Sequence, residues 1–248
     1  MRTLDVAVIG ICAALYAAFG ISTSQFSFMG VGFLPAVIVP AVFAVLFGPW
    51  VGGISGAIGI FIRDMFVHGV PLLSLSAGVP PNFILFFLIG YIAHRNISLK
   101  QALTGIAIAA VSLVAITVAF LPDFMSTLGA SADFVYISIL ATVIPTLAII
   151  AVVAVRWKEW RSYAIGAVLG QIAGAALLAV TLTLVSPYFM TTLQREYTAA
   201  SILPVFVWTI ITELPFILLA GPPIIKACYK AFPQLQRRQV RVTTLESS

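Results

Sequence analysis

Five apolar runs in this chain are each about as long as a helix that crosses a lipid bilayer. About 20 residues are needed to span roughly 30 Å of hydrocarbon. The apolar residues make up 61% of the chain and the charged residues only 8%, against about 45–50% and 25% in a soluble domain. The chain is therefore predicted to be an integral membrane protein. The five runs cover residues 4–23, 103–121, 134–155, 163–186 and 202–225.

Three shorter apolar runs raise the expected number of spans to eight. Residues 31–48, 51–67 and 80–94 are apolar but contain prolines and glycines, which favour short, tilted or broken helices. If 51–67 and 80–94 form a re-entrant hairpin, six spans remain. In either case the sequence predicts an all-α polytopic helix bundle.

The lysine and arginine residues predict how the chain is oriented in the membrane, because such residues accumulate in cytoplasmic loops. If both termini lie in the cytoplasm, every lysine and arginine except Arg63 and Arg195 falls on the cytoplasmic side. The net charge of +5 then reflects topology and not a nucleic-acid partner. We expect one transmembrane domain over residues 1–233 and a polar, basic cytoplasmic tail over 234–248. The cytoplasmic residues are Arg2, Arg95, Lys100, Arg156, Lys158, Arg161, Lys226, Lys230, Arg237, Arg238 and Arg241.

Small residues recur at helical spacing in three segments, where they allow close helix packing in lipid. In the third and seventh segments we expect these stripes to pack helices of the same chain. In the first segment the paired alanines could equally face another protein. The stripes are Gly10, Ala13, Ala14, Ala17 and Ala18; Gly52, Gly56 and Gly59; and Gly166, Gly170 and Gly174.

A family resemblance follows from the motifs of residues 1–95. The A-x-x-x-A pair Ala13 and Ala17 precedes Gly32-Phe-Leu-Pro35 and Leu46-Phe-Gly-Pro49, and then come Gly52, Gly53, Gly56, Gly59 and Asp64. This pattern resembles the S component of energy-coupling factor (ECF) vitamin transporters. Glu213-Leu-Pro-Phe and Gly221-Pro-Pro-Ile-Ile-Lys226 resemble that family's last helix.

The resemblance implies a multi-pass plasma-membrane subunit that binds a water-soluble vitamin or related micronutrient. A separate ATPase module would energise uptake, and no nucleotide-binding loop occurs in this chain. Ala13 and Ala17 would dock on a transmembrane coupling subunit, and the outer loops 24–32 and 67–80 would hold the vitamin. The family usually has six helices, so we expect an added hairpin within 103–155.

Glu213 is the strongest candidate among ionisable residues inside a span, where a charge costs at least about 2.5–3.5 kcal/mol. Pro215 follows it and frees a backbone carbonyl nearby. The carboxyl group has either a substrate-binding or a helix-linking role. Gln171, Thr209 and Thr212 are its expected partners.

A second candidate group closes the outer end of the third segment, where Arg63 and Asp64 precede His68. These charges either neutralise each other or line an outward-facing site with nearby polar and aromatic residues, which would suit a flat heterocycle. Ser22 and Ser24 are possible additions. The predicted substrate-binding set is Gln25, Phe26, Phe28, Asp64, Asn82, Trp208 and Glu213.

Other functions remain open on the residues alone. An ion-coupled secondary transporter would carry a proton on Glu213 or Asp64. Gly53-Ile-Ser55-Gly56 with His94 matches the serine and histidine of an intramembrane protease, although we expect no enzyme. A channel is not excluded. The scattered histidines and cysteines predict no metal site, and we expect no cofactor. The sequence does not identify the substrate.

Overall fold

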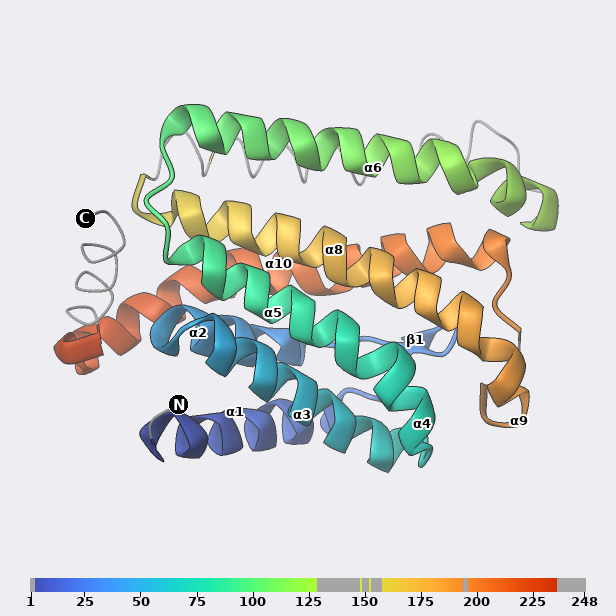
Figure 1. Ribbon diagram of the computed structural model, residues 1–248, viewed down its shortest axis with the longest axis horizontal. Coiled ribbons are helices and arrows are strands. Elements are labelled where there is room, and N and C mark those ends of the chain that lie inside the picture. The colour runs from blue at the N-terminus through green and yellow to red at the C-terminus, as the bar shows by residue number, and fades with distance from the viewer. Residues whose placement is uncertain (1–2, 129–147, 149–151, 153–157, 194–195, 236–248) are drawn as a thin grey trace.

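The computed structural model describes residues 3–128, 148, 152, 158–193 and 196–235. Six helices in this part are long and apolar enough to cross a membrane, which confirms the polytopic helical bundle (Figure 1). They are α1 (Thr3–Ser22), α3 (Pro49–Val67), the α4–α5 run (Pro71–Ala93), α6 (Leu99–Leu128), α8 (Arg161–Val185) with its short flanking turns, and α10 (Ala199–Ala231).

Of the three shorter apolar runs, two form helices long enough to span a membrane and one does not. Residues 51–67 and 80–94 belong to helical runs of 19 and 23 residues, so each is long enough to cross and the re-entrant hairpin is not supported. Residues 31–48 instead contain a short helix over Pro35–Phe47, made of the 3-10 turn η1 (Pro35–Val37) and α2 (Ile38–Phe47). The span predicted at 134–155 lies largely outside the described residues, as does most of the tail.

A tight turn joins α2 to α3. Gly48 ends α2 with a φ of 111°, a value that favours glycine, and Pro49 begins the next helix. A side chain at Gly52 would meet the Cα and Cβ atoms of Ala44. The two helices therefore form a close hairpin because small residues face each other. α2 contacts α1, α3, α5 and α10 and is largely buried among them.

The glycine stripes pack helices within the chain, as predicted for the third and seventh segments. Gly59 of α3 lies against Tyr16 and the Ala13 carbonyl of α1. Gly170 and Gly174 of α8 lie against α5 (Val79–Ala93), where added side chains would contact the backbone. Close backbone approach therefore joins α1 to α3 and α5 to α8, and contacts between α3 and α5 connect the two pairs.

The small residues of α1 that could face another protein differ in their exposure. Ala13 and Ala17 are 2% and 3% exposed and belong to the face of α1 that is buried in the bundle. They are therefore not presented to another protein in this structure. The neighbouring register, Gly10, Ala14 and Ala18, is exposed instead.

The start of α1 and the end of α10 lie at the same end of the bundle, together with the α2–α3 turn and the α5–α6 connection (Figure 1). The shared end agrees with the prediction that both termini lie on one side. At the other end are the strands β1 (Ser27–Phe28) and β2 (Val31–Gly32), α4 (Pro71–Leu73), the π-helical turn η2 (Ser74–Gly78), the 3-10 turn η4 (Ser186–Phe189) and α9 (Met190–Leu193). The expected loop at 67–80 is thus mostly helical.

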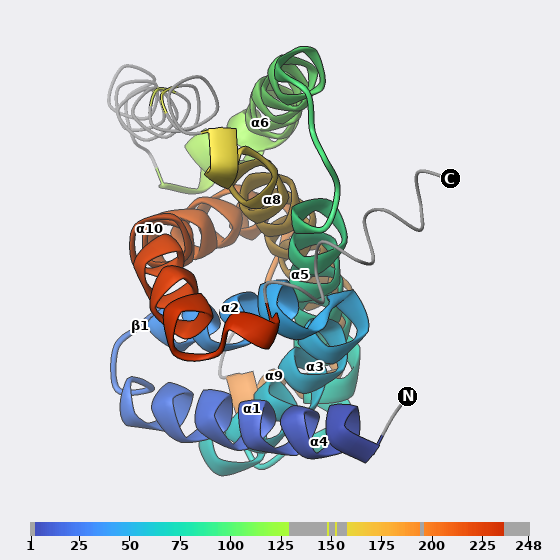
Figure 2. The same cartoon turned by 90° about the vertical axis from the view of Figure 1, so that its left-hand side faces the viewer.

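Helix α6 lies on the side of the bundle away from α1, against α8 and α10 (Figures 1 and 2). It follows α5 after a short connection, and the 3-10 turn η3 (Lys158–Trp160) precedes α8. The peripheral position of α6 is consistent with the expectation of an added hairpin within 103–155, although the second half of that hairpin is outside the described residues.

Candidate functional site

A cavity of about 90 Å³ lies inside the end of the bundle that carries the strand hairpin. Residues from the hairpin, α3, the α4–α5 run, α8, α9 and α10 line it, so segments far apart in the sequence converge there. Its polar lining consists of Arg63, Asp64, His68, Asn82, Tyr197 and Glu213. The remaining lining is Gly30, Val31, Gly32, Leu34, Ile60, Leu73, Ala77, Gly78, Leu178, Leu182 and Leu193.

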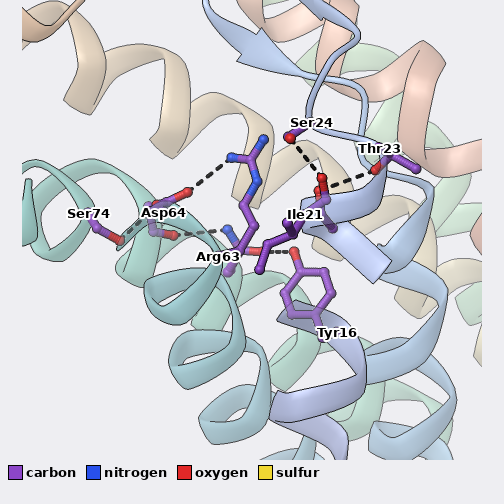
Figure 3. Close-up of polar contacts among 10 residues, drawn as sticks. Tyr16, Ile21, Thr23, Ser24, Arg63, Asp64 and Ser74 are labelled. Carbon is purple, nitrogen blue, oxygen red and sulfur yellow. Dashed lines mark hydrogen bonds and ion pairs between the residues drawn. The ribbon is translucent and has the colours of Figure 1, made fainter. Parts of the chain in front are cut away.

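A buried ion pair forms one wall of the cavity (Figure 3). Arg63 Nη1 donates to Asp64 Oδ1 at 3.0 Å, and the two side chains are 8% and 10% exposed. Ser74 Oγ donates to Asp64 Oδ2 at 2.7 Å, so both carboxylate oxygens are occupied. Glycines make room for this wall, because a side chain at Gly78 would clash with Asp64 and one at Gly32 would clash with Arg63.

His68 follows the last residue of α3 and also faces the cavity. Its backbone N–H donates to the Asp64 carbonyl at 2.7 Å. Burial lowers the pKa of the imidazole, and the Arg63 charge lowers it further, while the nearby Asp64 carboxylate acts in the opposite direction. The neutral form of His68 is therefore favoured beside the ion pair.

Asn82 connects the cavity to α1. Tyr16 Oη donates to Asn82 Oδ1 at 2.7 Å, and Asn82 Nδ2 donates to the Gly78 carbonyl at 2.9 Å. The Tyr16 ring is 1% exposed and packs edge-on against Phe86, with the centroids 5.7 Å apart. These bonds satisfy the amide of Asn82 and fix its orientation at the cavity wall.

Glu213 forms the opposite wall, in the middle of α10. Gln171 Nε2 donates to Glu213 Oε2 at 2.8 Å and to the Thr209 carbonyl at 3.3 Å. The predicted contact with Gln171 is therefore confirmed, and Thr209 takes part through its backbone. The Thr212 hydroxyl instead donates to the Trp208 carbonyl at 2.7 Å.

The strand hairpin covers the cavity. Its turn residues Met29 and Gly30 have φ values of 51° and 77°, as a type I′ turn requires. Trp208 Nε1 donates to the Val31 carbonyl at 3.0 Å, and Tyr197 Oη donates to the Met29 carbonyl. Two side chains from the last part of the chain thus hold the hairpin over the site.

The structure separates the predicted site residues into three groups. Asp64, Asn82 and Glu213 line the cavity together. Phe28 and Trp208 pack their rings 5.3 Å apart outside the lining and anchor the hairpin. Gln25 and Phe26 are exposed and do not line the cavity.

Sequence reasoning missed several lining residues. Tyr197, Leu178 and Leu193 come from segments where the sequence indicates only an apolar helix or a loop. Gly30 and Gly32 indicate a turn, but nothing in the sequence shows that this turn lies over Asp64 and Glu213. Only the chain's tertiary contacts reveal these neighbours.

The protease hypothesis fails on the position of its nucleophile. Ser55 is 0% exposed, and its Oγ donates to the Val51 carbonyl of the same helix at 2.6 Å. A buried hydroxyl engaged by its own helix is not presented to a substrate and water. No cluster of three or more histidine, cysteine, aspartate or glutamate residues that could hold a metal ion occurs in the described part of the chain.

A polytopic bundle with a small, partly open cavity at one end, lined by a few polar groups, is the arrangement expected of a membrane-embedded substrate-binding protein. Residues 1–156, more than half of the chain, match the family model of the ECF-type riboflavin transporter S component. The chain belongs to this family. It is therefore the substrate-binding subunit of an ECF transporter, a multi-pass plasma-membrane protein and not an enzyme. No curated protein and no solved structure matches the chain.

Proposed function

We propose that this chain binds riboflavin, or a flavin very close to it, in the cavity under the strand hairpin and delivers it to an ECF module. The family's description names riboflavin. The main structural support is the convergence of Asp64, Asn82 and Glu213 in one cavity with the apolar side chains of Leu178 and Leu182. A flat heterocycle with polar edges matches such a mixed lining.

The cavity must widen to admit a three-ring ligand. Its volume of about 90 Å³ is smaller than the roughly 150 Å³ of a cavity that accepts benzene. We propose that the hairpin is the wall that moves, because Ser27 and Phe28 are exposed. Hydrogen bonds from the side chains of Trp208 and Tyr197 hold its backbone in place. Tyr197→Phe removes one of these holding bonds and should speed riboflavin association. Tyr188→Phe is the control, since Tyr188 is 83% exposed.

Binding is tested by titrating purified protein with riboflavin and following the quenching of flavin fluorescence. Leu178→Trp places a large ring in the cavity and should abolish binding. Leu184→Trp puts the same ring on the same helix at a position that is 66% exposed, and it should bind as the wild type does. Equal binding by both variants would place the ligand elsewhere.

We further propose that α1 docks on a transmembrane coupling subunit through Gly10, Ala14 and Ala18, and that ATPase subunits supply the energy. These three small residues form an exposed stripe, whereas Leu15 lies on the exposed but bulky part of the same helix. Close helix approach in lipid needs small residues at the contact. The exposed register thus replaces the Ala13 and Ala17 register in this role.

Cellular uptake separates docking from binding. Ala14→Trp should abolish riboflavin uptake and leave riboflavin binding by the purified protein unchanged. Leu15→Trp should retain both. Ala13→Trp should lower the yield of folded protein, because Ala13 is packed against α3. Normal uptake by Ala14→Trp would refute this docking face.

A further inference from the structure

Arg63 leaves a hydrogen-bond donor unused beside the cavity. Its Nη1 serves Asp64, but its Nε has no partner among the described residues although the atom is buried. Buried N–H groups are rarely left unpaired, since each has lost its water without a replacement. Arg63 lines the cavity, so an acceptor on a bound molecule is the natural complement of this donor.

Of the two carboxyl groups that line the cavity, Asp64 is the one more fully engaged within the protein. Its two oxygens are occupied by Arg63 Nη1 and Ser74 Oγ at 3.0 and 2.7 Å. The pair is also neutral as a unit, so it offers no strong attraction to an anionic ligand. What this wall presents to a ligand is a donor with its charge already balanced.

Glu213 provides the matching acceptor. It lines the same cavity and lies within electrostatic range of Arg63. Gln171 Nε2 occupies Oε2, and within the described residues no hydrogen bond to Oε1 is present. The cavity therefore combines an unused donor on α3 with an acceptor on α10.

We propose that Arg63 Nε and the Glu213 carboxylate together recognise an imide edge, in which a ring N–H lies next to a carbonyl. Arg63 donates to the carbonyl oxygen and Glu213 accepts from the N–H. The inference rests on the proposed function, because the pyrimidine-dione ring of a flavin carries this edge. It assigns the polar end of the flavin to the interior of the cavity and makes both residues determinants of specificity.

A cycle of two ligands and two proteins tests the contact to Glu213. Riboflavin and 3-methylriboflavin, in which the imide N–H is replaced, are titrated against the wild type and Glu213→Met. In the wild type the methyl group should weaken binding about tenfold or more, because the buried Glu213 acceptor loses its donor. In Glu213→Met the two ligands should bind within about threefold of each other.

Three further variants keep the result interpretable. Glu196→Met changes an exposed glutamate outside the cavity lining and should keep the full methyl effect. Arg63→Lys retains a positive charge for Asp64 but lacks Nε, so it should weaken both ligands by the same factor. Glu213→Gln, which keeps an acceptor and the shape of the side chain, should keep part of the methyl effect even if Glu213→Met folds poorly.

The outcomes separate this inference from the proposed function. If riboflavin does not bind the wild type, the proposed function fails. If riboflavin binds but methylation weakens the wild type, Glu213→Met and Glu213→Gln equally, the imide assignment is wrong. If Arg63→Lys binds both ligands as the wild type does, Arg63 Nε is not a ligand contact.

Discussion

The two polar walls of the cavity are built differently. Near the end of α3, the Asp64 carboxylate accepts hydrogen bonds from Arg63 of the same helix and from Ser74 of η2. On α10, Glu213 receives one bond from Gln171. The first wall balances its charge inside the protein, whereas the second keeps a carboxyl oxygen available. The Asp64 carboxylate therefore mainly stabilises the site, whereas the Glu213 carboxyl group stays available to a ligand.

Asp64→Ala should have the largest effect on stability if that comparison is right. The variant leaves Arg63 buried without a counter-charge, which costs about 3–5 kcal/mol. Thermal unfolding in detergent measures the loss. Glu196→Ala, at an exposed loop position, should change stability by no more than about 0.5 kcal/mol. The double variant Arg63→Met with Asp64→Leu should recover most of the loss, and a double variant as unstable as Asp64→Ala would contradict the argument.

Gly78→Ala should disturb the same wall by crowding. An added Cβ would lie 2.5 Å from Asp64 Oδ2, so the carboxylate has to move and about 1–3 kcal/mol is lost. Gly10→Ala is the matched control, because no atom lies within 4 Å of the added Cβ. The same unfolding measurement compares them. Equal stability of the two variants would show that the α3 wall is not tightly packed.

Gln171→Leu tests the second wall. The change removes the donor to Glu213 Oε2 and should cost about 1–3 kcal/mol, because a buried polar group loses its partner. Riboflavin affinity should fall as well, since Glu213 is no longer held in place. Gln25→Leu alters an exposed glutamine and should change neither quantity. Unchanged binding by Gln171→Leu would argue that Glu213 does not need this positioning.

His68 should give the smallest effect, as a pH dependence. Its pKa in the folded state lies below the usual 6.5, so the unfolded state binds more protons just below that pH. The free energy of unfolding should therefore fall as the pH drops below 6.5 and level off below the folded pKa. His68→Gln should remove this part of the slope. A slope that is unchanged in the variant would assign the titration to another group.

The exposed and buried faces of α1 illustrate how far sequence reasoning reaches. Small residues at both registers, Ala13 with Ala17 and Ala14 with Ala18, predict close packing on either side. They do not reveal which side meets the bundle, because that choice depends on Tyr16 and on the glycines of α3. The predicted pairing of Gln171 with Glu213 succeeded for a local reason, since few polar groups exist in these spans and each needs a partner.

The sequence by itself determined that this chain enters a membrane as a helix bundle and which family it resembles. Hydropathy and glycine spacing are properties of single segments, so they can be read from the sequence without knowledge of the fold. Only the tertiary structure decided that Asp64, Asn82, Tyr197 and Glu213 share one cavity, and that Gln25 and Phe26 do not line it. These facts depend on how distant helices rotate and pack against one another, which no single segment encodes.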